Sequence, residues 1–424
     1  MSPPSAARCL VDAASLSPAT LTPPPSKSDA QRALALAHAL GDPSLAELPF
    51  DDDALPDDVK VLRRGLEILR TRPGAGAYID CHDGGAPFRI LLGQAAATPG
   101  AFVRLVGSAR LGQRPHRPLL EALRTTLGPA GLVLDEGSPW PITVRGAART
   151  PEPRFAISAS ESSQFPTSLL LAAAGLVVRE RRPWTVTLTG PTASRGYLEL
   201  TLAWLARMGF ATEVTDSAVT LLDVRAPSSK PVVPGDWSSI GYLLLVAWAS
   251  GGAVALVDKD AAHPDRAILR VLEEAGLYVD DRPGGLVAVT GSLRAGLSAS
   301  GEECPDLLPT LAALACVAPS DSTFTEVSIL RHKESDRLEG IRDLVRAGGG
   351  TTTLEGDVLV ITPGQVPARM ELSSRGDHRL AMAAATLAAL GRSTLVLEGP
   401  EHVTKSFPAF WSEVERAGVR VATS

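Results

Sequence analysis

The sequence predicts an α/β protein of two domains, built from six copies of one unit with buried helices and outer sheets. Three observations lead to this prediction. A short polar cluster opens an Ala/Leu-rich helix pattern six times, an amphipathic helix pattern follows each time, and short β-rich runs come after the second helix. Because the first helix of each copy is apolar nearly all round, we expect it to be buried.

The elements of each copy can be placed by residue range. The apolar helices are expected within residues 26–41, 82–100, 160–175, 235–252, 304–319 and 376–391. The amphipathic helices are expected within residues 57–70, 117–131, 197–210, 265–279, 336–350 and 407–421. Five of the latter end in a glycine that suits a left-handed turn, at intervals of about 70 residues: Gly131, Gly209, Gly276, Gly348 and Gly418. Strands are predicted at "LVAVTG" (286–291), "DVLVITPG" (357–364) and "STLVLEG" (393–399).

Two proline-rich segments divide the chain. "LTPPPSK" at 21–27 and "SSKPVVPGDW" at 228–237 are the predicted hinges. They favour a central domain at 25–234 with three units and a second domain formed by 1–24 plus 235–424, in which the N-terminal strand joins the C-terminal half. A continuous solenoid of six units is the alternative arrangement.

Composition excludes several classes of protein. The 424 residues carry a net charge of −6, whereas a nucleic-acid-binding protein is usually basic. Four cysteines without CxxC spacing predict free buried thiols in a reducing compartment. No apolar run reaches the roughly 20 residues of a membrane span, and no signal peptide is visible. We therefore expect a cytoplasmic protein, monomeric because no exposed apolar stripe is evident, that binds neither nucleic acid nor membrane.

The polar clusters that open the helices contain the residue types that bind anions. Helix starts carry free N–H groups and partial positive charge, and arginine binds phosphate or carboxylate with two parallel bonds. The cations are Lys27, Arg32, Arg89, Arg114, Arg337, Arg379 and Lys405; the hydroxyls and amide are Ser28, Ser162, Ser163, Ser194 and Gln164. Each alone is typical of a surface charge or a helix cap, and "GDHRLAM" could be a cap with His378 bonded to backbone. Recurrence at matching places favours a phosphate and carboxylate site.

At these motifs the chain resembles the 5-enolpyruvylshikimate-3-phosphate synthase family, the enolpyruvyl transferases also called 3-phosphoshikimate 1-carboxyvinyltransferases. The similarity runs from about Pro24 to Val419 and is carried by "SKSDAQRALALA", "RPHRPLLEAL", "SSQFPTSLLLAA", "SRGYLELTL", "GDWSSIGYLL", "HKESDRLEGI", "DHRLAMAAA" and "KSFPAF". The resemblance implies two domains of three βαβαββ units that close over the substrates. It implies transfer of enolpyruvyl from phosphoenolpyruvate to the 5-hydroxyl of shikimate 3-phosphate, in chorismate and aromatic amino acid biosynthesis, without metal or organic cofactor.

The resemblance also implies roles for individual residues. Shikimate 3-phosphate would be bound by Lys27, Ser28, Arg32, Ser162, Ser163, Gln164, Ser194, Tyr197, Asp306 and Lys333, with Ser162, Ser163 and Ser194 taking its phosphate. Phosphoenolpyruvate would be bound by Lys27, Gly85, Arg114, Gln164, Arg337, Arg379 and Lys405. The alcohol must lose a proton while the methylene carbon gains one, which calls for a base and an acid. Asp306 and Glu334 fit these roles, and whether Lys27 shares in the proton transfer stays open.

Several positions depart from the family pattern. The family's Asn-Ala-Gly-Thr loop is "DGGA" here, with Asp83 in place of Asn and Ala86 in place of Thr. An ionised Asp83 close to phosphate would repel it, so we predict that Asp83 weakens phosphoenolpyruvate binding. Ile90 replaces the usual Pro, and Ile329 replaces an Asn, which removes one polar contact to the shikimate side. Arg195 and Gly196 vary the loop before Tyr197.

Three other hypotheses compete with this one. The sister enzyme that transfers enolpyruvyl to UDP-N-acetylglucosamine uses a loop cysteine, but no cysteine lies between Cys81 and Cys304 here. A paralogue could bind shikimate 3-phosphate without turnover or act on another cyclic alcohol, given Asp83 and Ile329. An α/β repeat scaffold for protein partners would keep the polar helix starts of different units far apart.

Overall fold

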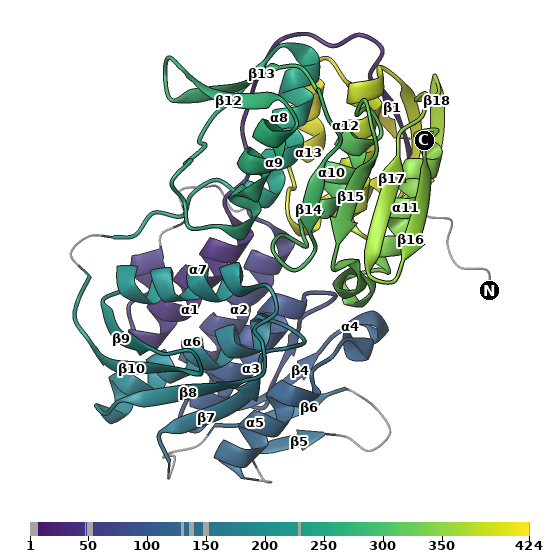
Figure 1. Ribbon diagram of the computed structural model, residues 1–424. Coiled ribbons are helices and arrows are strands. Elements are labelled where there is room, and N and C mark those ends of the chain that lie inside the picture. The colour runs from purple at the N-terminus through teal and green to yellow at the C-terminus, as the bar shows by residue number, and fades with distance from the viewer. Residues whose placement is uncertain are drawn as a thin grey trace. The chain divides into compact units, whose positions relative to one another are not determined.

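The chain folds into two compact units, each formed from segments that are not contiguous in sequence. The computed structural model describes residues 7–46, 48, 54–128, 131–134, 140–146, 152–227 and 230–423 (Figure 1). The terminal unit comprises Met1–Ser26, Asp53–Pro56 and Pro234–Ser424, and the central unit comprises Lys27–Asp52 and Asp57–Val233. The chain therefore changes unit at the two proline-rich segments and also on either side of Asp53–Pro56. The grouping of Asp53–Pro56 with the terminal unit has no signal in the sequence, and hinge motion at the crossings stays a prediction.

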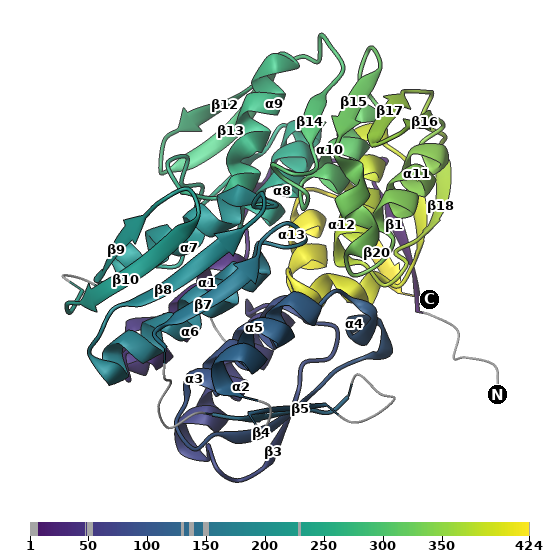
Figure 2. The ribbon, with the colours of Figure 1, turned by 60° about the horizontal axis from the view of Figure 1, so that its bottom comes forward.

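The central unit places three apolar helices in contact with one another. These are α1 (Lys27–Ala39), α3 (Gly85–Ala97) and α6 (Gln164–Glu180). Its other helices are η1 (Pro43–Ala46), α2 (Asp57–Thr71), α4 (Ala109–Gln113), α5 (Arg117–Leu127) and α7 (Arg195–Arg207). Its strands are β3 (Ala77–Asp80), β4 (Phe102–Val106), β5 (Leu132–Leu134), β6 (Ile142–Arg145), β7 (Arg154–Ser158), β8 (Trp184–Thr189), β9 (Phe210–Val214) and β10 (Ala218–Val224). The sheet β7–β10 covers one side of α6 (Figure 2).

The terminal unit repeats this plan. Its mutually packed helices are α8 (Trp237–Ser250), α10 (Leu308–Ala315) and α12 (His378–Gly391). Its other helices are η3 (Pro264–Ala267), α9 (Ile268–Glu274), η4 (Val327–His332), α11 (Arg337–Ala347), η5 (Pro400–Lys405) and α13 (Phe410–Arg416). Its strands are β1 (Arg8–Asp12), β2 (Thr20–Leu21), β11 (Ala253–Val254), β12 (Leu277–Arg282), β13 (Leu286–Gly291), β14 (Ser298–Ser300), β15 (Ser322–Thr325), β16 (Thr351–Glu355), β17 (Val358–Thr362), β18 (Arg369–Ser373), β19 (Thr394–Glu398) and β20 (Arg420–Thr423).

One strand order recurs in five four-stranded sheets of the described residues. Each sheet begins with a parallel pair, such as β7 and β8, and continues with two antiparallel neighbours, such as β10 and β9. A buried helix connects the parallel pair, and a second helix leads to the antiparallel pair, which gives the order βαβαββ. The five sheets account for five copies of the unit. The sixth copy is represented in the described residues by its two helices, α1 and α2. The predicted place of the N-terminal strand is confirmed, because β1 pairs with β19 and β20.

Capping residues explain where the buried helices begin. Asp236 caps α8 by accepting a hydrogen bond from Ser239 N at 3.0 Å, and Asp377 caps α12 by accepting one from Arg379 N at 2.9 Å. The helices begin within a residue or two of the polar clusters, so each cluster lies at a helix N-terminus. This confirms the predicted position of the polar groups.

The predicted helix-ending glycines are right in three copies and wrong in two. Gly209, Gly276 and Gly418 follow α7, α9 and α13 with φ angles of 86°, 93° and 87°. The helix α5 ends earlier than predicted, and Gly128, with φ 77°, makes the turn in place of Gly131. After α11 the residue Gly348 keeps a right-handed φ of −75°, and Gly349 makes the turn with φ 80°. In both cases another glycine was available nearby, and sequence alone does not rank them.

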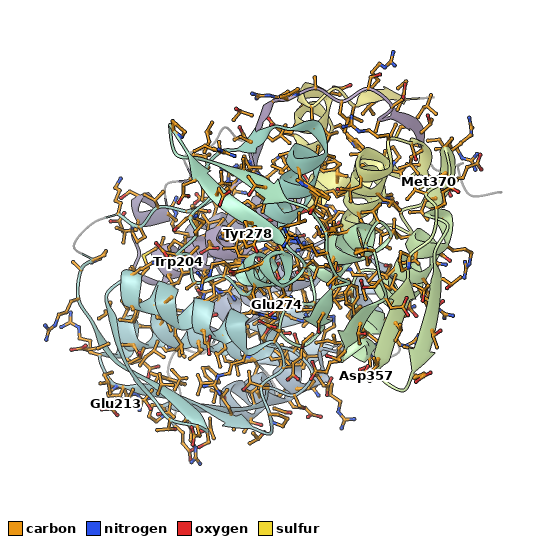
Figure 3. All side chains as sticks on the ribbon, turned by 45° about the horizontal axis from the view of Figure 1, so that its top comes forward. Trp204, Glu213, Glu274, Tyr278, Asp357 and Met370 are labelled. Atoms are coloured by element: carbon orange, nitrogen blue, oxygen red, sulfur yellow. The ribbon has the colours of Figure 1, made fainter. Side chains whose placement is uncertain are left out.

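Each unit has its own apolar core. The core of the central unit gathers the Ala and Leu side chains of α1, α3 and α6 with the inward side chains of its strands, and the terminal unit does the same around α8, α10 and α12. Trp204 on α7 is fully buried, whereas Glu213 on β9 lies at the periphery (Figure 3). Among the described residues, no helix is long and apolar enough to cross a membrane.

Candidate functional site

The terminal unit contains a fully buried arginine surrounded by carboxylates. Arg337 is 0% exposed and donates from Nη1 to Asp306 at 2.9 Å, from Nη2 to Glu334 at 2.8 Å and from Nε to Asp377 at 2.9 Å. Burial alone would lower the pKa of Arg337, but the carboxylates of Asp377, Glu334 and Asp306 raise it. The guanidinium is therefore permanently charged and organises the three carboxylates around it.

Asp306 receives two further cations. Its Oδ2 accepts from Arg379 Nη2 at 2.9 Å, and its Oδ1 lies 3.7 Å from Lys333 Nζ. Burial would raise the pKa of Asp306, but Arg379, Lys333 and Arg337 together hold it well below its usual range. Asp306 is therefore an ionised carboxylate at neutral pH, able to accept a hydrogen bond.

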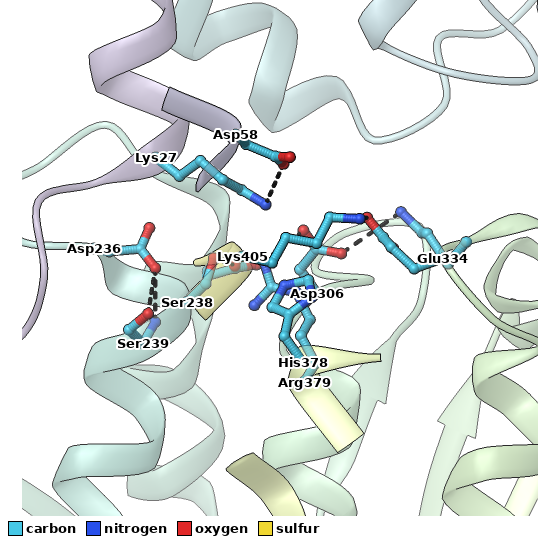
Figure 4. A network of polar contacts seen from close by, with 12 residues as sticks. Lys27, Asp58, Asp236, Ser238, Ser239, Asp306, Glu334, His378, Arg379 and Lys405 are labelled. Carbon is cyan, nitrogen blue, oxygen red and sulfur yellow. Dashed lines mark hydrogen bonds and ion pairs between the residues drawn. The ribbon is translucent and has the colours of Figure 1, made fainter. Parts of the chain in front are cut away.

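Glu334 completes this cluster. Its Oε1 lies 3.6 Å from Lys405 Nζ, while its Oε2 accepts from Arg337 Nη2. Figure 4 shows Lys405 and Glu334 pointing toward one another. The structure thus brings together all six residues that the resemblance assigned within this unit, in one continuous set of ion pairs: Asp306, Lys333, Glu334, Arg337, Arg379 and Lys405.

Helix starts position most of these side chains. Asp306 precedes α10, Arg337 is the first residue of α11 after its cap Asp336, and Arg379 is the second residue of α12. Asp377 was missed as a partner of Arg337. The sequence signal was present, because Asp before a helix predicts a cap, but the cap position gives no hint that the same carboxylate also binds Arg337.

The central unit holds a second buried arginine in a contrasting environment. Arg32 is 5% exposed and donates from Nε to Thr201 Oγ1 at 2.9 Å, from Nη1 to Ser28 O at 2.8 Å and from Nη2 to Tyr197 O at 2.9 Å. Within the part of the chain that the structure describes, it makes no ion pair. Burial lowers its pKa to about 10, against the raising effects of Asp29 and Tyr197. Arg32 is therefore a charged group held only by neutral oxygens.

The first residue of α1 pairs with the start of the next helix. Lys27 Nζ lies 3.1 Å from Asp58 Oδ2, and Asp58 is a buried residue in the first turn of α2 (Figure 4). Asp58 was not singled out in the sequence, where "DDVK" is typical of an acidic first turn. Asp58 is therefore the partner of a predicted site residue.

The starts of α6 and α7 gather the predicted hydroxyl groups. Ser163 precedes α6 and Ser194 precedes α7; both are buried, and neither side chain caps its helix. Ser162 Oγ accepts from Gln164 N at 3.2 Å, and Gln164 Oε1 accepts from Arg89 Nη1. The helices α1, α6 and α7 are linked here, because Arg32 on α1 contacts Thr201 on α7, which contacts Thr167 on α6 at 3.0 Å.

Gly85 and Arg114 meet at the start of α3. A Cβ at Gly85 would collide with the guanidinium of Arg114, so this position needs glycine for Arg114 to approach. The departure at Asp83 is exposed, and its carboxylate accepts a hydrogen bond from Ser108 Oγ, the cap of α4. The other departures serve packing or the surface: Ile90 and Ile329 pack in the cores, and Arg195 pairs with Glu199 at 3.2 Å.

Known proteins share this sequence and fold over nearly their whole length. The family model of EPSP synthase (3-phosphoshikimate 1-carboxyvinyltransferase) matches residues 12–414. The chain is 33% identical to the 3-phosphoshikimate 1-carboxyvinyltransferase of Methanopyrus kandleri over 425 residues, covering 95% of this chain and 96% of the relative. It is 33% identical to the enzyme of that name from Aeropyrum pernix over 418 residues, covering 94% and 93%.

Solved structures give the same fold class. The EPSP synthase of Acinetobacter baumannii superimposes with a TM-score of 0.71 at 20% identity, covering 98% of this chain and all of that one. The enolpyruvyl transferase NikO of Streptomyces tendae superimposes with a TM-score of 0.66 at 16% identity, covering 99% of each. The predicted enolpyruvyl transferase-like α/β fold is confirmed.

Proposed function

This chain belongs to the EPSP synthase (3-phosphoshikimate 1-carboxyvinyltransferase) family, and from that premise we propose that it transfers the enolpyruvyl group of phosphoenolpyruvate to the 5-hydroxyl of shikimate 3-phosphate, releasing phosphate. The observation that carries the proposal is the ion-pair cluster of the terminal unit, where two carboxylates and four cations lie in contact. The comparisons do not favour a paralogue that binds without turnover. The product would feed chorismate and aromatic amino acid biosynthesis.

Shikimate 3-phosphate is assigned chiefly to the central unit. Arg32 is a buried cation without a carboxylate partner in the described residues, and such a charge is costly unless a ligand supplies the anion. Ser162, Ser163 and Ser194 would take the phosphate at the starts of α6 and α7, where free N–H groups favour negative charge. Tyr197, Ser28 and Gln164 border these groups, while Asp306 and Lys333 would meet the 5-hydroxyl.

Phosphoenolpyruvate is assigned to cations of both units. Arg337, Arg379 and Lys405 would bind it from the terminal unit, and Lys27, Gly85, Arg114 and Gln164 from the central unit. In the structure the terminal cations are bound by Asp306 and Glu334. A phosphate or carboxylate of the substrate would replace these carboxylates as their partner, since charge-assisted bonds to arginine form equally well with either.

This exchange of partners would prepare Asp306 as the base. Because Arg379 helps to hold the pKa of Asp306 low, a substrate that takes Arg379 away raises that pKa and makes Asp306 a better proton acceptor. The 5-hydroxyl oxygen then bonds to C2 of phosphoenolpyruvate and gives its proton to Asp306. Substrate would also replace Glu334 as the partner of Arg337 and Lys405, so that this carboxylate can take up a proton and deliver it to C3.

Elimination reverses the second proton transfer. The C2–O bond to phosphate breaks, the leaving phosphate takes the proton that Asp306 had accepted, and C3 returns its proton to Glu334, which restores the double bond. Lys27 is the second candidate for the C3 proton, and its Nζ is held 3.1 Å from Asp58 Oδ2. Residues at helix starts, backed by buried partners, need little rearrangement as charge develops.

The proposal also covers domain closure, oligomeric state, cofactors and cellular compartment. Groups from both units act in one reaction, with domain closure excluding water, as the family resemblance implies. The enzyme acts as a monomer in the cytoplasm without metal or organic cofactor. Four free and buried cysteines fit a reducing compartment.

Phosphate release from phosphoenolpyruvate tests the proposal directly. The assay compares shikimate 3-phosphate, UDP-N-acetylglucosamine and no acceptor. Turnover with shikimate 3-phosphate alone supports the proposal. Turnover only with the nucleotide sugar, or no turnover with either acceptor, would overturn it.

A further inference from the structure

We infer that Thr201 and Thr167 are positioning residues that set the guanidinium of Arg32 for shikimate 3-phosphate. The inference deepens the proposed function and rests on it. It comes from hydrogen bonds of two hydroxyl groups to which neither the sequence motifs nor the family resemblance assigned a role.

The hydroxyl of Thr201 has a fully determined set of partners. A threonine hydroxyl has one donor and two acceptor sites. Thr201 Oγ1 lies 2.9 Å from Tyr197 O, one helical turn earlier, and a carbonyl can only accept. Thr201 must therefore accept from Arg32 Nε at 2.9 Å and from Thr167 Oγ1 at 3.0 Å. This assigns Thr167 as the donor.

These contacts close a ring around one edge of the guanidinium. Arg32 Nε donates to Thr201, Thr201 donates to Tyr197 O, and Tyr197 O also accepts from Arg32 Nη2 at 2.9 Å. With Ser28 O accepting from Nη1, three of the five N–H groups of Arg32 have protein partners. One N–H on each terminal nitrogen is left for a ligand oxygen.

Because no carboxylate contacts Arg32 in the described residues, the ring of hydrogen bonds sets the orientation of its guanidinium. Within the described residues, neutral oxygens alone hold the plane of Arg32, so each hydrogen bond carries more of the positioning than it would beside an ion pair. Thr201 is 0% exposed and Thr167 is also buried, so water cannot replace a lost hydroxyl. Valine has nearly the shape of threonine and would remove the bonds without opening a cavity.

The experiment measures KM for each substrate and kcat in Thr201→Val, Thr201→Ser and Thr167→Val. We expect Thr201→Val to raise KM for shikimate 3-phosphate by about tenfold, as the loss of a hydrogen bond to a charged group does, with kcat and KM for phosphoenolpyruvate within about twofold. Thr201→Ser should restore wild-type KM. Thr167→Val removes only the donor to Thr201 and should raise KM by about threefold.

Thr386→Val is the matched control. Thr386 is a buried threonine on α12 whose Oγ1 donates to Met382 O at 2.9 Å, the same helical bond without an arginine. Thr386→Val should lose similar thermal stability and keep wild-type KM. Should Thr201→Val fail to fold, Thr167→Val carries the test, since it leaves Thr201 in place.

Three outcomes would overturn the inference. These are a wild-type KM for shikimate 3-phosphate in both valine variants, failure of serine to restore it, or an equal rise in Thr386→Val. If the wild type itself shows no turnover, the proposed function fails and takes the inference with it, whereas turnover with unchanged valine variants removes the inference alone.

Discussion

Arg337 and Arg32 are both buried arginines, yet their surroundings are opposite. Arg337 in the terminal unit touches three carboxylates, whereas Arg32 in the central unit touches a hydroxyl and two carbonyl oxygens. A cluster of paired cations and carboxylates suits groups that exchange protons, because the cations shift the pKa of the carboxylates beside them. A buried arginine whose hydrogen-bond partners are all neutral oxygens suits the binding of an anion. On the proposed function, the terminal unit supplies the carboxylates for proton transfer and the central unit supplies most of the groups that bind shikimate 3-phosphate.

The largest effect should come from removing the proposed acid. Glu334→Gln keeps size and shape but cannot supply the C3 proton, so kcat should fall about a thousandfold while shikimate 3-phosphate still binds. Steady-state phosphate release measures kcat. Glu371→Gln, an exposed carboxylate on β18 that lies 3.7 Å from Arg369, serves as the control and should retain full activity. Equal rates in wild type and Glu334→Gln would remove Glu334 from the mechanism.

The two arginines should also differ in how much each contributes to the free energy of unfolding. Arg337→Met leaves the buried carboxylate of Asp377 without the arginine that neutralises it and removes one cation each from Asp306 and Glu334, so it should lower the free energy of unfolding by about 3 to 5 kcal/mol. Arg32→Met removes three hydrogen bonds to neutral oxygens but leaves no contacting carboxylate in the described residues without its cation, so it should cost less, about 1 to 2 kcal/mol. Denaturant unfolding of the ligand-free proteins measures both. Equal losses would show that the two environments are energetically alike.

A buried histidine near two arginines should make the stability of the protein depend on pH. Burial, then Arg89 and Arg114, lower the pKa of His116 to about 3, against the raising effect of its bond to Leu111 O. Below pH 6.5 the unfolded chain gains a proton that the folded protein does not, so stability falls with pH down to about 3.

The variant His116→Gln tests this dependence. Between pH 7 and pH 4, the free energy of unfolding should change by about 3 kcal/mol less in His116→Gln than in wild type. Urea unfolding at several pH values measures it, and His332→Gln, at an exposed position, should behave like wild type. An unchanged pH dependence in His116→Gln would count against a neutral buried imidazole.

The smallest expected effect concerns Asp83, the exposed carboxylate that departs from the family pattern just before α3. Asp83→Asn keeps an acceptor for Ser108 and removes the charge, so KM for phosphoenolpyruvate should fall about threefold, a modest change because the position is exposed. The exposed Asp216→Asn is the control. An unchanged or higher KM in Asp83→Asn would refute the prediction.

The sequence predicted the positions of the helices and of the polar residues better than the ion-pair and hydrogen-bond partners of those residues. Helix starts can be predicted from local patterns, so the positions of Lys27, Arg337 and Arg379 followed from the polar clusters alone. The turn glycines were misplaced where several glycines lie together, because each of them can adopt a positive φ. The local sequence pattern was therefore sufficient to predict the fold class and the clustering of polar groups at the helix N-termini.

The partners of the charged groups depend on contacts between distant segments. Asp377 binds Arg337 across 40 positions and Thr201 binds Arg32 across 169. A buried threonine at helical spacing is typical of core packing, so nothing in "ELTLAWL" distinguishes Thr201 from its neighbours. The bonds that orient the arginines therefore became visible only in three dimensions.

Calorimetric titration of shikimate 3-phosphate into the full chain, without phosphoenolpyruvate, tests the division of work most directly. Wild type and Glu334→Gln should bind it with equal affinity, while Arg32→Met should bind it at least about tenfold more weakly. Undiminished binding by Arg32→Met, or a loss of affinity in Glu334→Gln as large as in Arg32→Met, would contradict the account.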